Sequence, residues 1–245
     1  MSTRAPRLRP SALPVRILFA LLGLLAAGTV AAGEDEATTL ARLGKAQRYS
    51  IATTAPANPI ETGGAAILIH APIDTVRPII TGYGRYKQYI PTFEQSRLIG
   101  KKDGESEVYF DVPVLNGAAH VWAVVRMAKP KSTPEGEIIT GRLVKGNVED
   151  FRTVWRLRKV DDKTTIVKLE LLVDPEIPLP ASFVTHHLQE AAAKGVTAIR
   201  KEAEQRAGYV APSAAPAPVA SAAPAATEKQ EGSPSDEKGT NIAQR

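Results

Sequence analysis

Three segments of this chain alternate apolar and polar residues with a period of two, and this pattern constrains the fold more than any other feature. The segments are EVYFDVPVL (107–115), FRTVWRLRKV (151–160) and TTIVKLELLV (164–173). Successive side chains of a strand point to opposite faces of a sheet, so each segment would bury one face and expose the other. The alternation predicts an antiparallel sheet that is covered on a single side.

A long segment near the C-terminus is the predicted cover for this sheet. Residues 181–206 would form a helix about 40 Å long if unbroken. The predicted contact stripe on this helix consists of Val184, Leu188, Ala191, Gly195 and Ile199. Small residues in its middle either bring the helix close to the sheet or leave an empty volume, and the sequence favours neither. The predicted fold class is α+β.

The first 32 residues have the features of a secretory signal. Arginines precede an apolar run, and small residues lead up to Ala32. The run from Ile17 to Ala32 would span about 24 Å as a helix, less than the roughly 30 Å hydrocarbon core, which disfavours a membrane anchor. We therefore expect a signal peptide at 1–32 that is cleaved after Ala32, and export to the periplasm or the medium. Because the chain has no cysteine, it would be stabilised by core burial without disulfides.

The rest of the chain divides by composition into three parts. Residues 33–62 are an N-terminal extension, residues 63–206 carry the predicted domain, and residues 207–245 are an Ala/Pro-rich tail. The tail has too few large apolar residues to offset its ordering entropy, so it is predicted to be disordered. It would serve as a spacer or bind a protein partner that the sequence does not identify.

The charge of the chain argues against nucleic acid as a partner. The formal net charge is +5, and four of these positive charges lie in residues 1–32, so that 5 − 4 leaves the remainder near +1. A nearly neutral protein lacks the cationic surface that phosphate backbones require.

Half of the six tyrosines of the chain lie in the stretch TGYGRYKQYIP (81–91). Their spacing of three places Tyr83, Tyr86 and Tyr89 near one side of a helical turn. They either line or cover the entrance of a pocket, with their hydroxyls in water, or provide ordinary packing for short helices. Stacking on nucleic acid is disfavoured by the charge.

Three phrases follow one another in a fixed order within residues 63–206. They are Ala71-Pro72 with Tyr83-x-x-Tyr86-x-x-Tyr89-Ile90-Pro91, then GNVEDFRTVWRLRKVDDKTT (146–165), then Val173-Asp174-Pro175 with Leu179-Pro180. In order and spacing they resemble the START-like (SRPBCC) superfamily, and within it the polyketide cyclase/dehydrase and coenzyme Q-binding branch.

The resemblance implies a helix-grip fold, in which a curved antiparallel sheet of about six or seven strands wraps around the long C-terminal helix. It also implies a cavity between sheet and helix that binds hydrophobic molecules and opens near the three tyrosines. The residues then expected to contact a ligand are Tyr83, Tyr86, Tyr89, Phe110, Val112, Val125, Trp155, Leu169, Val184, Leu188 and Ala191.

The polar residues of the long helix predict neither catalysis nor metal binding. Ser182, His186 and Glu190 recur at intervals of four, but three residues along one helix seldom converge as a catalytic triad requires. The adjacent His186 and His187 point about 100° apart, so at most one of them is expected to contact Glu190. We predict no catalytic residue, no metal site and no cofactor.

The segment from 120 to 127 has one face with charged residues and one without. We expect the uncharged face, Val121, Ala123, Val125 and Met127, to point inward, because a buried arginine without a partner is costly. The reverse orientation would place His120, Trp122 and Arg126 in the cavity as polar anchors.

Together these features favour an exported, non-catalytic protein that holds a hydrophobic small molecule, such as a lipid, a quinone or a polyketide-like compound. Transient contact with a membrane is compatible with this role. The first alternative is a cyclase or dehydratase acting in the same cavity, which would need His120, Arg126 or His187 to converge there. The second is a protein-interaction module with a filled interior.

Overall fold

The computed structural model describes residues 31–53, 59–114, 117–175 and 178–211. The elements are α1 (Ala31–Leu43), β1 (Gln47–Ile51), β2 (Thr62–Ile69), α2 (Ile73–Ile80), the 3₁₀ turn η1 (Tyr83–Arg85), α3 (Tyr86–Tyr89), β3 (Gln95–Lys102), β4 (Glu105–Val114), β5 (Ala119–Met127), β6 (Lys131–Thr133), β7 (Gly136–Gly146), β8 (Val148–Lys159), β9 (Thr165–Pro175) and α4 (Ala181–Arg206). Apart from Ala31 and Ala32, the predicted signal peptide lies outside the described residues, as does the predicted disordered tail from residue 212 onward.

The strands form one antiparallel sheet in the order β1-β2-β9-β8-β7-β5-β4-β3, with β6 paired to β7. The α+β class, the antiparallel sheet and the long C-terminal helix are therefore as predicted. The sheet has nine strands, more than the six or seven expected. The difference includes β1, which is mostly exposed, and β6, which has three residues. β6 has no alternating apolar pattern, and in β1 only Tyr49 and Ile51 alternate with polar residues, which is too short a run for hydrophobic periodicity to identify a strand.

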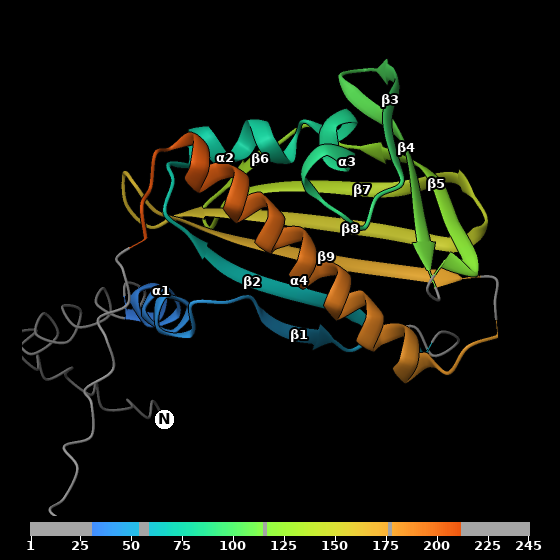
Figure 1. Cartoon of the computed structure of the whole chain (residues 1–245), viewed down its shortest axis with the longest axis horizontal. Helices are drawn as coiled ribbons and strands as arrows, with labels where there is room; N and C mark the ends of the chain where they lie inside the picture. The colour runs from blue at the N-terminus through green and yellow to red at the C-terminus, as the bar shows by residue number, and fades with distance from the viewer. Residues whose placement is uncertain (1–30, 54–58, 115–116, 176–177, 212–245) are drawn as a thin grey trace, which may run out of the picture. The chain divides into compact units, whose positions relative to one another are not determined.

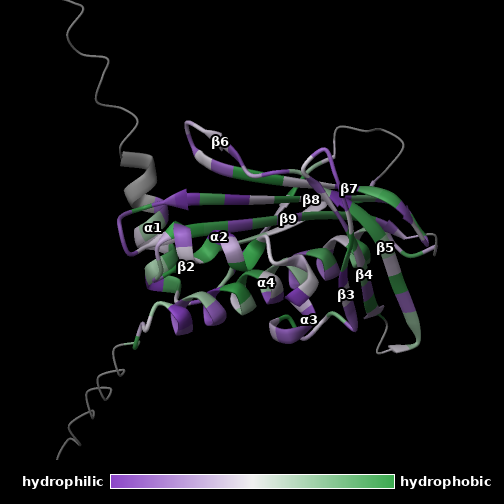
Figure 2. Ribbon diagram, turned by 90° about the horizontal axis from the view of Figure 1, so that it is seen from above, coloured by the Kyte–Doolittle hydropathy of each residue, from purple (hydrophilic) through white to green (hydrophobic). Residues whose placement is uncertain are grey.

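Helices α2, α3 and α4 cover one face of the sheet, which we call the inner face (Figures 1 and 2). In β8 the alternation is as predicted, because Trp155 and Leu157 are buried on this face while Arg156 lies on the other. Helix α4 adds Val196 and Ile199 to the same core. The hydrophobic core thus lies between α4 and the strands beneath it.

Small residues bring α4 close to the sheet. A Cβ atom added at Gly63 of β2 would lie 2.5 Å from the backbone nitrogen of Gln189 in α4. One added at Gly195 would lie 3.0 Å from a methyl carbon of Leu169. Of the two explanations that the sequence left open for the small residues of α4, close approach is the one observed at these positions.

The opposite, outer face is not wholly exposed, contrary to the one-sided sheet that we expected. Helix α1 covers it at the β2–β9 end, where Leu40 packs on Ala66, Leu68 and Ile166. Because Ala66 and Leu68 alternate with inner-face residues along β2, this strand is buried on both sides. An apolar run without alternation, such as GAAILI, is the pattern that such a strand leaves in a sequence.

Charged side chains of the outer face pair with one another beside α1. The Glu36 carboxylate of α1 lies 2.8 Å from Arg158 Nη2 and 2.5 Å from Lys168 Nζ. Burial raises the pKa of Glu36, but the hydrogen bonds from Lys168 and Arg158 outweigh it and leave the pKa below its usual value. Glu170 is 8% exposed and accepts a hydrogen bond of 3.1 Å from Arg156 Nε. The described part of the N-terminal extension therefore packs on the sheet.

Candidate functional site

The three tyrosines of residues 81–91 form an aromatic cluster on the inner face. The Tyr86 ring stands edge-on to Tyr83 and Tyr89, each with its centroid 5.9 Å away, and stacks on Phe110 at 5.8 Å. Phe93 completes the cluster at 5.6 Å from Tyr86. Tyr83 and Tyr86 are buried and Tyr89 is half-buried. The spacing of three brings the rings together even though the backbone changes from a 3₁₀ turn to a short α-helix.

The hydroxyls of Tyr86 and Tyr89 bind backbone carbonyl oxygens, whereas the pocket-entrance alternative placed them in water. Tyr86 donates a hydrogen bond of 2.6 Å to the carbonyl oxygen of Ile80, and Tyr89 one of 2.7 Å to that of Ile79. These carbonyls belong to the last turn of α2, where a helix leaves acceptors without intrahelical partners. The two hydroxyls thus tie the tyrosine segment to α2.

Burial raises the pKa of all three tyrosines. The pKa of Tyr86 lies well above its usual value, and the pKa values of Tyr83 and Tyr89 are raised to about 12. Deprotonation would place a charge in a poorly solvated position, which burial disfavours. The tyrosines are therefore protonated near neutral pH and act as hydrogen-bond donors and apolar surfaces.

Six of the other eight residues predicted to contact a ligand lie in two packed clusters of the inner face. Phe110, Val125, Trp155 and Leu169 are buried in the main core. Val184 and Leu188 pack together with Ile60 in a smaller cluster near the start of α4. These side chains are thus mutual neighbours in a packed interior, and their contact with a ligand stays a prediction.

The two remaining predicted residues, Val112 and Ala191, are half-buried. In α4 it is Ala192, with no exposed surface, that joins the main core instead of Ala191. The predicted stripe contained Ala191, but neighbouring residues of a helix point about 100° apart, and the side of α4 that is buried is turned toward Ala192 and Val196.

A hollow of about 230 Å³ opens beside Tyr83. It is lined by Thr81, Gly82, Tyr83, Gly84, Arg85, Leu98, Lys101 and Ser106. Because Tyr83 also belongs to the main core, the hollow borders the apolar interior. Tyr83 was predicted from the sequence, whereas Lys101 and Ser106, which β3 and β4 bring to this place from elsewhere in the chain, were not.

The surface around this hollow is both basic and apolar. Arg85 and Lys101 contribute two positive charges to its wall. Leu98, which belongs to its wall, is 48% exposed, although large apolar side chains are usually buried. Cationic and apolar groups side by side suit a molecule with an anionic head and an apolar chain.

A second hollow, of about 420 Å³, lies at the start of α4 and has a largely polar lining: Pro59, Glu61, Ser182, Thr185, His186 and Gln189. Beside it Glu190 lies 3.7 Å from His186 Nε2 and 3.4 Å from His187 Nδ1, through its two different oxygens. The prediction that at most one histidine contacts Glu190 was wrong, because one carboxylate can reach two neighbours with separate oxygens.

Strand β5 is oriented as we expected. Ala123, Val125 and Met127 are buried on the inner face. Their neighbours His120 and Arg126 therefore point to the outer face, since side chains alternate along a strand. Arg126 finds its partner there, with Nη2 2.5 Å from Glu107 Oε1. His187 is exposed on α4, so His120, Arg126 and His187 do not converge on the inner face.

The family model described as polyketide cyclase / dehydrase and lipid transport matches residues 69–200, more than half of the 245-residue chain. The chain belongs to this family. The matched range contains the tyrosine cluster, strands β3 to β9 and most of α4. Helix α1 and strand β1 precede it. No helix among the described residues has the length and apolar character needed to span a membrane.

Solved structures share the START-like helix-grip fold with this chain. A START superfamily protein from Mycobacterium smegmatis is 16% identical, with 59% of this chain and 98% of that chain covered and a TM-score of 0.52. A STAR-related lipid transfer protein from Xanthomonas axonopodis is 19% identical, with 65% of this chain and 94% of that chain covered and a TM-score of 0.53. The lipid transfer and protein localization domain of human StarD13 is 13% identical, with 69% of this chain and 95% of that chain covered and a TM-score of 0.51. Among curated proteins no match was found.

Proposed function

We propose that this protein binds an amphipathic molecule, with an apolar chain and an anionic head, and holds it without chemical conversion. The observation that carries the proposal is the hollow beside Tyr83, which joins two cationic side chains to the apolar core. Arg85 and Lys101 would bind the head, and the apolar chain would pass Tyr83 toward the interior. A lipid has this chemistry, and the lipid transfer named for two of the structural neighbours is in keeping with it.

Binding would require the tyrosine segment to move. The hollow of about 230 Å³ is smaller than the roughly 300 Å³ at which small-molecule pockets begin. The segment consists of η1 and α3, with three and four residues, and is tied to α2 through the hydroxyls of Tyr86 and Tyr89. Breaking two such bonds costs about 1–3 kcal/mol. Burying about four methylene groups of a ligand would offset this cost, at about 0.8 kcal/mol each.

A non-catalytic role is supported by where the candidate acids and bases lie. His120 and Arg126 belong to the outer face, and His187 is exposed on α4. The described buried polar residues are Ser96, Thr153, Thr165, Glu170 and Thr185. Glu170, the charged member of this set, is engaged by Arg156 on the outer face. The cyclase or dehydratase alternative therefore gains no support from these side chains.

The binding proposal is tested by filling the hollow. The full chain would be purified, its bound molecules identified by native mass spectrometry and lipid extraction, and its affinity for a fluorescent fatty acid measured. Ser106→Phe places a ring in the hollow beside Tyr83, whereas Ser182→Phe makes the same change in the second hollow. We expect Ser106→Phe to weaken binding about tenfold or more, equivalent to about 1.4 kcal/mol, and Ser182→Phe to leave it unchanged. Repeated recovery of protein without any small molecule, and no binding of the probe, would refute the proposal.

Export is a separate part of the proposal and rests on the arginine-flanked apolar run and on Ala32. N-terminal sequencing of the protein recovered from outside the cytoplasm is expected to begin at Gly33. An N-terminus at Met1 on all of the protein, in a cytoplasmic fraction, would contradict it. Neither result bears on the fatty-acid measurement.

A further inference from the structure

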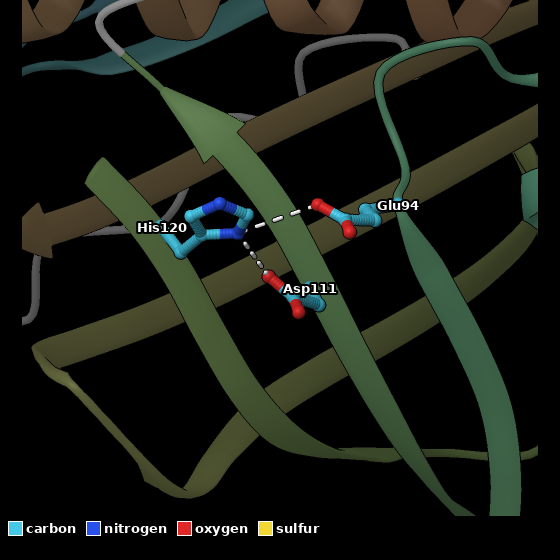
Figure 3. A group of neighbouring side chains, drawn as sticks. All are labelled: Glu94, Asp111 and His120. Carbon is cyan, nitrogen blue, oxygen red and sulfur yellow. Dashed lines mark hydrogen bonds and ion pairs between the residues drawn. The ribbon is translucent and has the colours of Figure 1, made fainter. Parts of the chain in front are cut away.

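Three metal-ligating side chains meet on the outer face of β4 and β5 (Figure 3). His120 Nδ1 lies 3.1 Å from Asp111 Oδ1 and 3.5 Å from Glu94 Oε2. All three ligand atoms lie within 4.8 Å of one another, and within the described ranges this is the one such group of three. They come from separate segments: Glu94 precedes β3, Asp111 belongs to β4 and His120 to β5.

The backbone around these three residues is fixed. The N–H of Glu94 donates a hydrogen bond of 2.9 Å to the carbonyl oxygen of Asp111. The backbones that carry these two side chains are therefore bonded to each other. Asn147 Nδ2 donates to the carbonyl oxygen of His120 at 2.7 Å, and its Oδ1 accepts the N–H of Trp122 at 2.8 Å. These contacts fix the backbone from which the three side chains extend.

The donor set determines which ions would fit. One imidazole nitrogen and two carboxylate oxygens suit divalent first-row transition metals, whereas Mg²⁺ and Ca²⁺ prefer oxygen ligands throughout. Zinc binds nitrogen and oxygen at about 2.0–2.2 Å, so tetrahedral angles place neighbouring donors roughly 3.3–3.6 Å apart. The observed separations of 3.1 and 3.5 Å lie close to this range.

We propose that Glu94, Asp111 and His120 bind a divalent transition-metal ion, of which Zn²⁺ is the probe, with water at the remaining position. From the sequence a metal was considered at the histidines of α4, with His70 or His120 as additional ligands, and His120 was not brought together with Glu94 and Asp111. Asp111 and His120 sit on diagonal positions of the β4–β5 ladder, where Asp111 pairs with Trp122 and Pro113 with His120. The strand register that brings Asp111 near His120 is set by the pairing of β4 with β5, and a sequence pattern does not show it.

The ion would connect the tyrosine segment to the β4–β5 hairpin. Glu94 directly follows Phe93, which packs on Tyr86 at 5.6 Å and on Phe110 at 5.0 Å. Bound metal would therefore hold the C-terminal side of the segment that has to move when a ligand enters. This consequence rests on the proposed function, whereas the metal site itself does not.

The metal site is tested by calorimetric titration of the untagged full chain with Zn²⁺. We expect one ion per chain, and a loss of affinity of about tenfold or more in Glu94→Gln, Asp111→Asn and His120→Ala. His186→Ala is the matched control, because His186 also lies beside a carboxylate but belongs to no such group of three among the described residues. Circular dichroism would show that each variant is folded. If His120→Ala does not fold, Glu94→Gln decides the test, because Glu94 is exposed and glutamine has nearly the same shape as glutamate.

Trp122 supplies a second readout, since it pairs with Asp111 across the β4–β5 ladder and the other tryptophan, Trp155, is buried on the inner face. Co²⁺ is expected to quench the Trp122 emission and Zn²⁺ to restore it. Equal Zn²⁺ affinity of wild type and His120→Ala, or equal loss in His186→Ala, would overturn the proposal. Both measurements are made without lipid, so their failure is distinct from failure of the proposed function.

Discussion

At strands β2 and β9 both faces of the sheet are covered, whereas at the β5–β4–β3 end the inner face carries short helical turns and no helix of the described residues covers the outer face. The first end has α4 on one side and α1 on the other, with Leu40 and Ala65 both nearly fully buried. The second end has the hollow beside Tyr83 and the exposed Leu98. The difference indicates that stability is concentrated at one end, and that the other can move to admit a ligand.

The largest expected effect comes from matched leucine substitutions at the two ends. Leu40→Ala removes a side chain with 2% exposure from beneath α1 and should lower the free energy of unfolding by about 2–5 kcal/mol. Leu98→Ala, at 48% exposure, should change it by less than about 0.5 kcal/mol. Urea denaturation of both variants measures the contrast. Equal effects would mean that α1 is not part of the cooperative structure.

A matched pair of glycine substitutions sharpens the same comparison. Gly63→Ala would force its Cβ to within 2.5 Å of the α4 backbone and should destabilise the protein by about 1–3 kcal/mol. At Gly84 the nearest atom to an added Cβ is 3.5 Å away, so Gly84→Ala should be neutral or stabilise by about 0.4–1 kcal/mol. Thermal and urea denaturation measure the change in stability, and its sign, for each of the two variants. Destabilisation by Gly84→Ala as large as that by Gly63→Ala would remove the distinction between a tight and an open end.

The smallest effect expected is a dependence on alkaline pH at the open end. The pKa of Tyr83 is raised to about 12 in the folded protein from an ordinary value of 10.0, so the folded state retains a proton that the unfolded chain loses. This contribution to stability is fully present below pH 10 and is lost as the pH rises toward 12. Between pH 8 and pH 11 the wild type should lose about 1 kcal/mol more stability than Tyr83→Phe. Parallel losses in the two proteins, measured by urea denaturation, would contradict the burial of this hydroxyl.

Much of the inner face could be predicted from the chain, because burial on one side of a strand leaves a period of two. Trp155 and Leu169 were assigned to the interior in this way, and both are buried there. The tyrosine cluster was also visible, since a spacing of three brings rings together within one or two helical turns. Its hydrogen bonds to Ile79 and Ile80 were not, because they depend on how the turn after α2 is folded.

The hollow and the metal-ligating triad could not be predicted, because their residues come from different strands. Ser106 joins Tyr83 because β3 packs against η1 and pairs with β4, and His120 joins Glu94 through the β3–β4–β5 register. A shift of one residue in that register would send His120 to the inner face. No local pattern of the sequence specifies such a pairing.

The sequence by itself determined the α+β class, the alternating inner faces of β4, β8 and β9 and the long covering helix, because these depend on periodicities within single segments. Tertiary structure alone decided that α1 covers part of the outer face and that α4 approaches Gly63. It also decided that Glu94, Asp111 and His120 meet. Each of these features depends on the distance between segments far apart in the chain, which packing and strand register set and local periodicity does not encode.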